Sequence, residues 1–118
     1  MNVFMCFSAF NLHVKVFPRE VEYRKKGETV KFVCESNIPS AHLKWYKTVE
    51  KGFNNPIAEQ PVTPNKGYQI REIKTSSAHY LELIIGKLEE AEEGLYICKG
   101  NFKGQKDYQY SRVTLVQK

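Results

Sequence analysis

The chain has 118 residues, of which 42% are hydrophobic and 26% are charged, and its formal net charge is +5. This length fits one folded domain, and the hydrophobic content excludes a chain that is disordered throughout. No stretch comes near the roughly 18 consecutive apolar residues that a membrane-spanning helix needs, so the sequence predicts none.

Residues 1–13 form an apolar segment ahead of the first clear strand and contain no Asp, Glu, Lys or Arg. One interpretation is the end of a secretory signal peptide or leader, with a small-residue cleavage site near Ser8 or Ala9. The missing basic residue at its start argues against a complete signal. The alternative is an exon-boundary remnant or an extension of the first strand. We expect residues 14–118 to form a single folded domain.

The next three runs alternate apolar and polar residues, as strands with one buried face do. Residues 14–18 predict an edge strand that Pro18 ends, because proline cannot donate a hydrogen bond to a neighbouring strand. In the third run, residues 43–47, Lys44 and Tyr46 point outward, because side chains alternate along a strand. Residues 28–34 and 43–47 predict the second and third strands, whose inward-facing side chains are apolar: Val30, Phe32, Cys34, Leu43 and Trp45.

Residues 48–67 are rich in glycine, proline and asparagine, so any strand there is expected to be short and irregular. Alternation resumes at residues 68–75. It continues at residues 80–85, where the inward-facing side chains are Leu81, Leu83 and Ile85.

An acidic turn at residues 89–93 precedes the next predicted strand. In that strand Tyr96 and Cys98 face inward, while Ile97 and Lys99 face outward.

Residues 109–116 predict the closing strand, with Val113 and Leu115 facing inward. Together the runs supply the apolar faces of two sheets that pack on each other. The sequence therefore predicts an all-β sandwich of two antiparallel sheets.

A cysteine, a tryptophan and a second cysteine resemble the pattern of the immunoglobulin superfamily. Cys34 is followed by Trp45 eleven positions later (45 − 34), and Cys98 ends a Gly-x-Tyr-x-Cys run. The resemblance covers roughly residues 14–117 and implies an immunoglobulin-like Greek-key sandwich with a Cys34–Cys98 disulfide. The implied core markers are Trp45, Tyr96, Leu83 and Ile85.

The spacing and one departure refine this resemblance. The two cysteines are 64 positions apart (98 − 34), which suits an I-set or V-like domain with an extra strand after the third. Glu92 stands where family members usually have Asp, so the resemblance does not decide whether Arg71 or another base pairs with it. Tyr96 occupies the family position of the tyrosine corner, whose hydroxyl bonds to nearby backbone.

Two shorter matches resemble adhesion proteins of the superfamily. Residues 16–27 are similar to the opening of fasciclin-II-type first domains. Residues 62–65 and 68–70 are similar to first domains of neural cell adhesion molecules. This resemblance implies that the protein contacts a cell-surface immunoglobulin-type protein, either a second copy of itself or a different chain.

The chain has three cysteines, so a Cys34–Cys98 bridge leaves Cys6 unpaired. A disulfide implies an oxidising compartment, which favours a secreted protein or the ectodomain of a cell-surface protein. No Asn-x-Ser/Thr site supports secretion independently. Intracellular, muscle-type immunoglobulin domains are the alternative.

No motif for catalysis or cofactor binding occurs in the sequence, so we predict a protein that is not an enzyme and has no cofactor or metal. His13, His42 and His79 lie on separate predicted segments, and we interpret each as a surface histidine rather than a zinc ligand. The acidic turn lacks the ligand spacing of a calcium loop. No recognised nucleic-acid-binding motif is present either, so nucleic acid is not an expected partner.

Outward-facing residues around Trp45 and Cys98 predict a partner-binding surface. Aromatic and aliphatic side chains exposed beside lysines are typical of interaction faces. Tyr108 is a further aromatic residue before the closing strand, although the sequence does not fix its register. The alternative is that residues 48–60 of the same chain cover this face. The candidate residues are Lys44, Tyr46, Ile97, Lys99 and Tyr110.

Lys99, Lys103 and Lys106 lie in or beside the loop after the second cysteine, where they would form one basic tip. Such a tip would attract an acidic protein or a heparan-sulfate-like polysaccharide. The alternative is that the positive charge is scattered over the surface and serves solubility.

These observations favour an extracellular recognition module that mediates cell adhesion or receptor binding through protein–protein contact. A basic glycosaminoglycan-binding or soluble ligand-binding domain is the second hypothesis. An intracellular structural domain is the third. Salt-sensitive retention on heparin would favour the second hypothesis, and reduced Cys34 and Cys98 in the native protein would favour the third.

Overall fold

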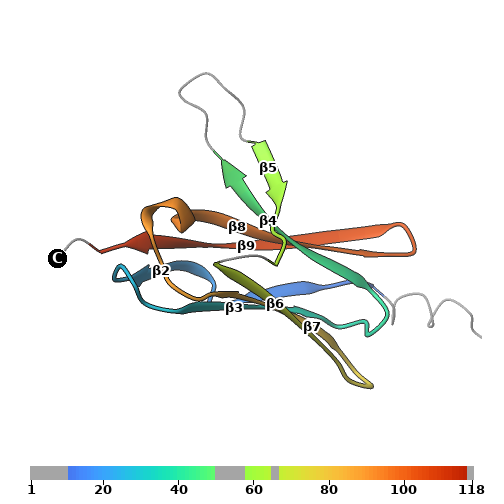
Figure 1. Cartoon of the computed structure of the whole chain (residues 1–118). Coiled ribbons are helices and arrows are strands. Elements are labelled where there is room, and N and C mark those ends of the chain that lie inside the picture. Colours follow the sequence, from blue (N-terminus) through green and yellow to red (C-terminus); the bar gives the residue numbers. More distant parts are fainter. Residues whose placement is uncertain (1–10, 50–57, 65–66, 117–118) are drawn as a thin grey trace, which may run out of the picture.

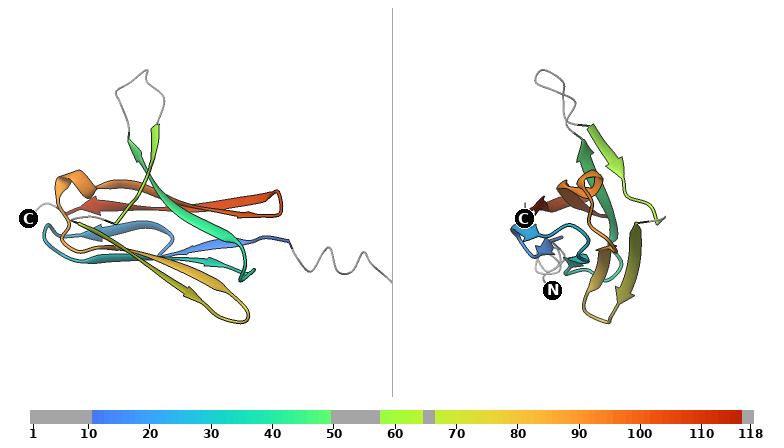
Figure 2. Two further views of the ribbon diagram at one scale, coloured as in Figure 1. Left: turned by 45° about the vertical axis from the view of Figure 1, so that its right-hand side comes forward. Right: turned by 60° about the vertical axis from the view of Figure 1, so that its left-hand side comes forward.

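The computed structural model describes residues 11–49, 58–64 and 67–116, which fold into two β-sheets packed face to face (Figure 1). Figure 2 shows the long β8–β9 hairpin in one layer and β3 and β7 in the other. The elements are β1 (Val14–Phe17), β2 (Glu20–Arg24), β3 (Val30–Ser36), β4 (His42–Val49), β5 (Ala58–Pro61), β6 (Tyr68–Lys74), β7 (His79–Ile85), the 3-10 turn η1 (Glu90–Glu92), β8 (Gly94–Phe102) and β9 (Gln105–Leu115).

The strand order is β1-β3-β7-β6 in one sheet and β2-β9-β8-β4-β5 in the other, which confirms the predicted all-β sandwich. Strand β5 pairs with β4 and is the additional short strand expected from the cysteine spacing. It brings four residues of the irregular segment onto the edge of the five-stranded sheet.

One strand pair differs from the expected antiparallel arrangement, because β2 runs parallel to β9. The backbone N–H of Val14 in β1 donates to Asp107 of β9, and further along β9, Ser111 pairs with Glu20 of β2. Strands β1 and β2 therefore advance along β9 in one direction. The chain changes sheets at the cis peptide before Pro18 without turning back, and this places β2 parallel to its neighbour.

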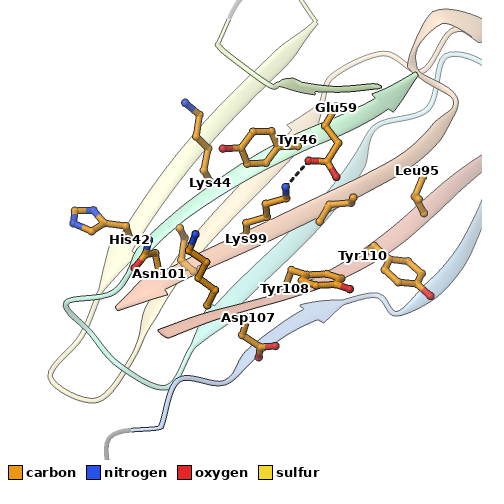
Figure 3. A pocket seen from close by; sticks show the side chains of 14 residues that line it. His42, Lys44, Tyr46, Glu59, Leu95, Lys99, Asn101, Asp107, Tyr108 and Tyr110 are labelled. Atoms are coloured by element: carbon orange, nitrogen blue, oxygen red, sulfur yellow. Dashed lines mark hydrogen bonds and ion pairs between the residues drawn. The ribbon is translucent and has the colours of Figure 1, made fainter. Parts of the chain in front are cut away.

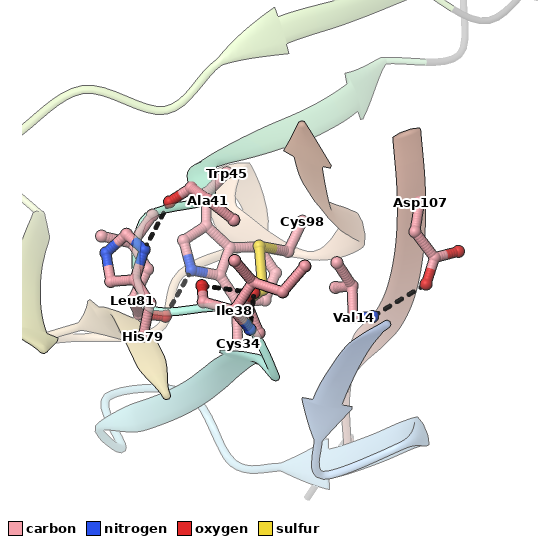
Figure 4. The surroundings of a disulfide bond; sticks show 10 residues. Val14, Cys34, Ile38, Ala41, Trp45, His79, Leu81, Cys98 and Asp107 are labelled. Carbon is pink, nitrogen blue, oxygen red and sulfur yellow. Dashed lines mark hydrogen bonds between the residues drawn. A yellow bond between two sulfur atoms is a disulfide. The ribbon is translucent and has the colours of Figure 1, made fainter. Parts of the chain in front are cut away.

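The core lies around the bridge between Cys34 of β3 and Cys98 of β8, whose Cα atoms are 6.3 Å apart (Figure 4). Trp45 is 1% exposed, and its indole Nε1–H donates to the Leu81 carbonyl across the two sheets at 2.9 Å. The ring of Phe32 lies 6.0 Å from that of Trp45, centre to centre. The expected core markers are all buried, and so are the alternating residues of β3 and β7.

Tyr96 forms the expected corner, because its hydroxyl donates to the Glu92 carbonyl at 2.5 Å. Burial raises the pKa of the Tyr96 phenol, which keeps this hydroxyl protonated. The hydroxyl has one proton, which it donates to the Glu92 carbonyl. The Tyr68 hydroxyl, 3.0 Å away, must therefore be the donor in the bond between the two tyrosines. Tyr96 therefore joins β8, the acidic turn and β6.

Removing the Tyr96 hydroxyl is expected to destabilise the domain. Tyr96→Phe deletes two hydrogen bonds of a buried group and should lower the free energy of unfolding by about 1–2 kcal/mol. Urea unfolding followed by tryptophan fluorescence measures the loss. The control is Tyr68→Phe, which deletes only one of the two bonds at a half-buried residue and should cost less. A Tyr96→Phe variant no less stable than Tyr68→Phe would contradict the corner.

The Glu92 side chain accepts a hydrogen bond from the Glu89 backbone N–H, in a reciprocal capping box across η1. The sequence did not decide whether Arg71 pairs with Glu92. The Arg71 guanidinium instead lies 3.8 Å from a carboxylate oxygen of Glu82 in β7. The longer glutamate side chain is thus used to close the 3-10 turn.

The prediction of a surface histidine is wrong for His79, which is 2% exposed. Its Nδ1 lies 2.8 Å from the Ala41 carbonyl and its Nε2 lies 2.7 Å from a Glu72 carboxylate oxygen. Both ring nitrogens therefore have polar partners, which allows the imidazole to be buried between β6 and the turn before β4. His13 and His42 are exposed, as predicted.

Leu12 is also buried in this core, and its backbone N–H donates to the Gln105 side chain. Cys6 and the proposed cleavage site lie outside the described residues. The leader interpretation and the domain boundary at residue 14 therefore stay predictions.

Candidate functional site

The outer face of the five-stranded sheet is hollowed into a groove of about 960 Å³ over β4, β8 and β9. We define this groove by its lining residues Lys44, Tyr46, Ile97, Lys99, Tyr108 and Tyr110, with Glu59 at its β5 edge. Figure 3 shows Tyr46, Lys99 and Glu59 on one side and Tyr108 and Tyr110 on the other. Alternation creates this face, because the neighbours of these residues in sequence, Trp45, Cys98 and Ser111, are buried.

All five residues predicted as partner contacts line this groove, although they come from three different strands. Tyr110 of β9 is 52% exposed and Tyr108 is 59% exposed, so their rings form an open rim. The prediction that Ile97 points to solvent is wrong in one respect. Ile97 lies on the outer face but is only 8% exposed.

The cover over Ile97 comes from its cross-strand neighbours. Ile97 is paired with Tyr46 on β4 and with Tyr110 on β9, and both of these side chains are larger. Alternation predicts which face a side chain is on, but it does not predict how far its neighbours extend over it. Ile97 is thus the apolar floor of the groove, and the tyrosines are its walls.

Lys99 positions the Tyr46 side chain, which is one wall of the groove. Its ammonium is paired with Glu59 of β5 and lies 4.9 Å from the centre of the Tyr46 ring. The ammonium of Lys44 lies 6.0 Å from the same ring. These cation–π contacts fix the ring without covering it, since Tyr46 remains partly exposed.

The alternative was that residues 48–60 cover this outer face. The described part of that segment lies mainly beside the face. Strand β5 pairs edge to edge with β4, and Glu59 is its contribution to the groove. Residues 50–57 lie outside the described part of the chain. Glu59 was not predicted, because the irregular composition of residues 48–67 gives no register from which its direction follows.

Sequence reasoning also missed two exposed apolar residues on β2. Val21 is 38% exposed and Tyr23 is 66% exposed. They pair with Arg112 and Thr114 of β9, the strand that also carries Tyr108 and Tyr110. The alternation of Val21, Glu22 and Tyr23 was the available signal, and it extends the aromatic surface to the sheet edge.

The expected basic tip is only partly formed. Lys99 lies within β8 and is paired with Glu59, whereas Lys103 lies at the β8–β9 turn. Within the described residues, no acidic side chain is within ion-pair distance of Lys44 or Lys106, which both line the groove. The positive charge is therefore concentrated at the hairpin end of the groove.

The described residues contain no cluster of three or more His, Cys, Asp or Glu side chains arranged to hold a metal ion. No helix among them is both long and apolar enough to cross a membrane. The groove offers apolar contact, tyrosine hydroxyls and ammonium groups, which together suit non-covalent binding.

The family model of the immunoglobulin domain matches residues 21–109 of this chain. A search of curated proteins gives no match. A crystal structure of Dpr2 Ig1-Ig2 in complex with DIP-Theta Ig1-Ig3 matches with a TM-score of 0.70 and 11% identity, covering 91% of this chain and 33% of that one.

Two other solved structures have the same fold. The RIG-5 IG1 homodimer matches with a TM-score of 0.67 and 15% identity, covering 91% of this chain and 99% of that one. A three-domain structure of titin matches with a TM-score of 0.65 and 17% identity, covering 88% of this chain and 32% of that one. The chain therefore spans about a third of the matched chain in the Dpr2–DIP-Theta complex and about a third of the titin chain.

Proposed function

Because the chain belongs to the immunoglobulin domain family, we propose that it is an extracellular recognition module that binds another protein through the outer face of its five-stranded sheet. The observation that carries this proposal is the groove, in which exposed tyrosines surround the apolar floor formed by Ile97. The binding energy of protein interfaces is concentrated in such aromatic anchors.

The groove has the composition of an interface centre and rim. Its floor and walls are apolar or aromatic, and Lys44 and Lys106 lie beside them. Interfaces are enriched in tyrosine and have polar, solvent-accessible margins. Val21 and Tyr23 extend the exposed apolar surface, which is unusual in a domain that functions without contacts.

The neighbouring structures support a protein as the partner. One contains Dpr2 bound to DIP-Theta and another is a homodimer of RIG-5 IG1. The Cys34–Cys98 bridge supports an extracellular location, because disulfides persist in oxidising compartments. The titin neighbour represents the intracellular alternative, for which reduced cysteines in the native protein would be the deciding observation.

Removing the exposed aromatic ring should weaken binding without affecting the fold. We expect Tyr46→Ala to cost about 1–2 kcal/mol of binding free energy, or about 5-fold to 30-fold in Kd. The melting temperature should change little, because Tyr46 is only partly buried. A tetravalent domain, whose avidity reveals weak contacts, is first screened against immunoglobulin-domain ectodomains and against itself. Surface plasmon resonance on the partner found then compares the variants.

The matched control is Tyr80→Ala, which removes a half-buried tyrosine from β7 of the other sheet. It should bind the partner as the wild type does. Equal binding by wild type and Tyr46→Ala, with a loss in Tyr80→Ala, would move the recognition surface to the other sheet. Unfolding of Tyr46→Ala would show that this residue belongs to the core.

A further inference from the structure

The pairing of strands arranges the groove residues in rows with different chemistry. An extended chain has the same spacing between alternate residues, about 7 Å, as these rows have along the strands. From the middle of the sheet towards the β8–β9 hairpin, the rows across β4, β8 and β9 are Tyr46, Ile97 and Tyr110; Lys44, Lys99 and Tyr108; and His42, Asn101 and Lys106.

The groove has two carboxylates at its margin, and neither belongs to these three rows. Glu59 is paired with Lys99, and Asp107 accepts a hydrogen bond from the Val14 backbone N–H. Lys44 and Lys106 have no such partner among the described residues. The groove therefore has an apolar row followed by two rows that each carry a lysine without an ion-pair partner among the described residues, an arrangement that attracts an acidic ligand.

We propose that the groove binds an extended, acidic segment of a different protein, with one apolar side chain on Ile97 and carboxylates opposite Lys44 and Lys106. This inference rests on the proposed function and specifies its partner. An apolar residue followed by acidic residues two and four positions later matches the order and spacing of the rows. Specificity then comes from the combination of the apolar anchor and the charges.

The charges disfavour a second copy of this chain as the occupant. A symmetric dimer places the same patch of both copies in one interface. Each copy would bring Lys44, Lys106 and the exposed Arg112 of the same face, whereas Glu59 is already paired. Like charges brought together in this way oppose association.

A sulfated polysaccharide also fits the groove less well than an acidic protein segment. Its repeating sulfates would meet the Glu59 carboxylate at the β5 edge, and it has no hydrocarbon side chain for the Ile97 floor. Two lysines of the lining have no ion-pair partner in the part of the chain that the structure describes, whereas strong polyanion binding needs many cations. The mixed chemistry of the rows favours a polypeptide.

The test uses three end-blocked pentapeptides and nuclear magnetic resonance of the whole labelled chain. The acidic probe is Leu-Thr-Glu-Thr-Glu, the neutral probe is Leu-Thr-Gln-Thr-Gln, and Ser-Thr-Glu-Thr-Glu lacks the apolar anchor. We expect the acidic probe to shift the amide signals of Ile97 and Lys99 and to bind more tightly than the other two. Its advantage over the neutral probe should disappear in high salt, since the charges are exposed.

Two variants with the same net charge separate the groove from the rest of the surface. Lys44→Gln with Lys106→Gln should weaken binding of the acidic probe by about fivefold, the loss expected for two exposed ion pairs. Lys15→Gln with Lys74→Gln removes two exposed lysines from β1 and β6 of the other sheet and should leave the affinity unchanged.

Four results would overturn the proposal. They are equal binding of the acidic and neutral probes, no shift of groove signals by any probe, tighter binding of a heparin tetrasaccharide at Lys44 and Lys106, and dimerisation in sedimentation equilibrium that Tyr46→Ala abolishes. Equal binding, or such a dimer, would leave the groove as the recognition surface and change only its occupant. The recognition surface itself fails only if Tyr46→Ala also leaves partner binding intact.

Discussion

Replacing both Cys34 and Cys98 by alanine is expected to lower the free energy of unfolding by about 4 kcal/mol. The bridge joins residues 64 positions apart, and the longer the loop that a disulfide closes, the more conformations it removes from the unfolded chain. It also joins the central strands of the two sheets beside Trp45. A domain of this size has about 5–15 kcal/mol of stability in total, so the double variant would lose a large fraction of it.

Guanidinium unfolding of the oxidised wild type, the reduced wild type and the double variant measures this effect. Reduced wild type and variant should be similarly unstable, because both lack the bridge. Cys6→Ser is the control, since it leaves the bridge intact and should unfold as the wild type does. The pairing would be wrong if non-reducing peptide mapping found Cys6 linked to Cys34 or to Cys98.

Trp45→Ala is expected to cost about 3–5 kcal/mol, the range for removing a fully buried aromatic ring. The indole is 1% exposed and packs against Phe32 on the opposite sheet. Its removal leaves a cavity at the centre of the sandwich and deprives the Leu81 carbonyl of its indole donor. Because the tryptophan fluorescence is lost with the mutation, far-ultraviolet circular dichroism must follow unfolding.

Trp45→Phe separates the two contributions. It keeps an aromatic ring in the core but cannot donate to the Leu81 carbonyl. Its free energy of unfolding should therefore lie between those of the wild type and Trp45→Ala. About 1–3 kcal/mol is expected for the buried carbonyl left without that partner, with a further loss from the smaller ring. A Trp45→Phe variant as stable as the wild type would show that the indole hydrogen bond contributes nothing.

The sequence was sufficient to predict the sandwich because its signals are local and repeat with period two. Val30, Phe32 and Cys34 are apolar at alternate positions of one strand, and β3 has this burial pattern in the structure. The same alternation placed Tyr46 and Lys99 on a common outer face, where they are in contact. Predictions that depend on the direction of a side chain along one strand were therefore confirmed.

Predictions that depend on neighbouring strands were less successful. Ile97 is covered by residues of β4 and β9, and His79 is buried by partners on β6 and in the turn before β4. Glu59 reaches Lys99 from a segment without a regular pattern. Cross-strand register and long-range hydrogen bonds determine these positions, and neither can be obtained from a single strand considered alone.

The parallel pairing of β2 with β9 has a mechanical consequence. When tension pulls the chain before β2 one way and the chain after β9 the other way, the two strands are drawn lengthwise past each other. The backbone bonds along the register from Glu20 opposite Ser111 to Arg24 opposite Leu115 then bear the load together. An antiparallel hairpin pulled from its two free ends would instead open one bond at a time. Forced unfolding is governed by the unfolding rate, so this short edge strand sets the domain's resistance to stretching more than its size suggests.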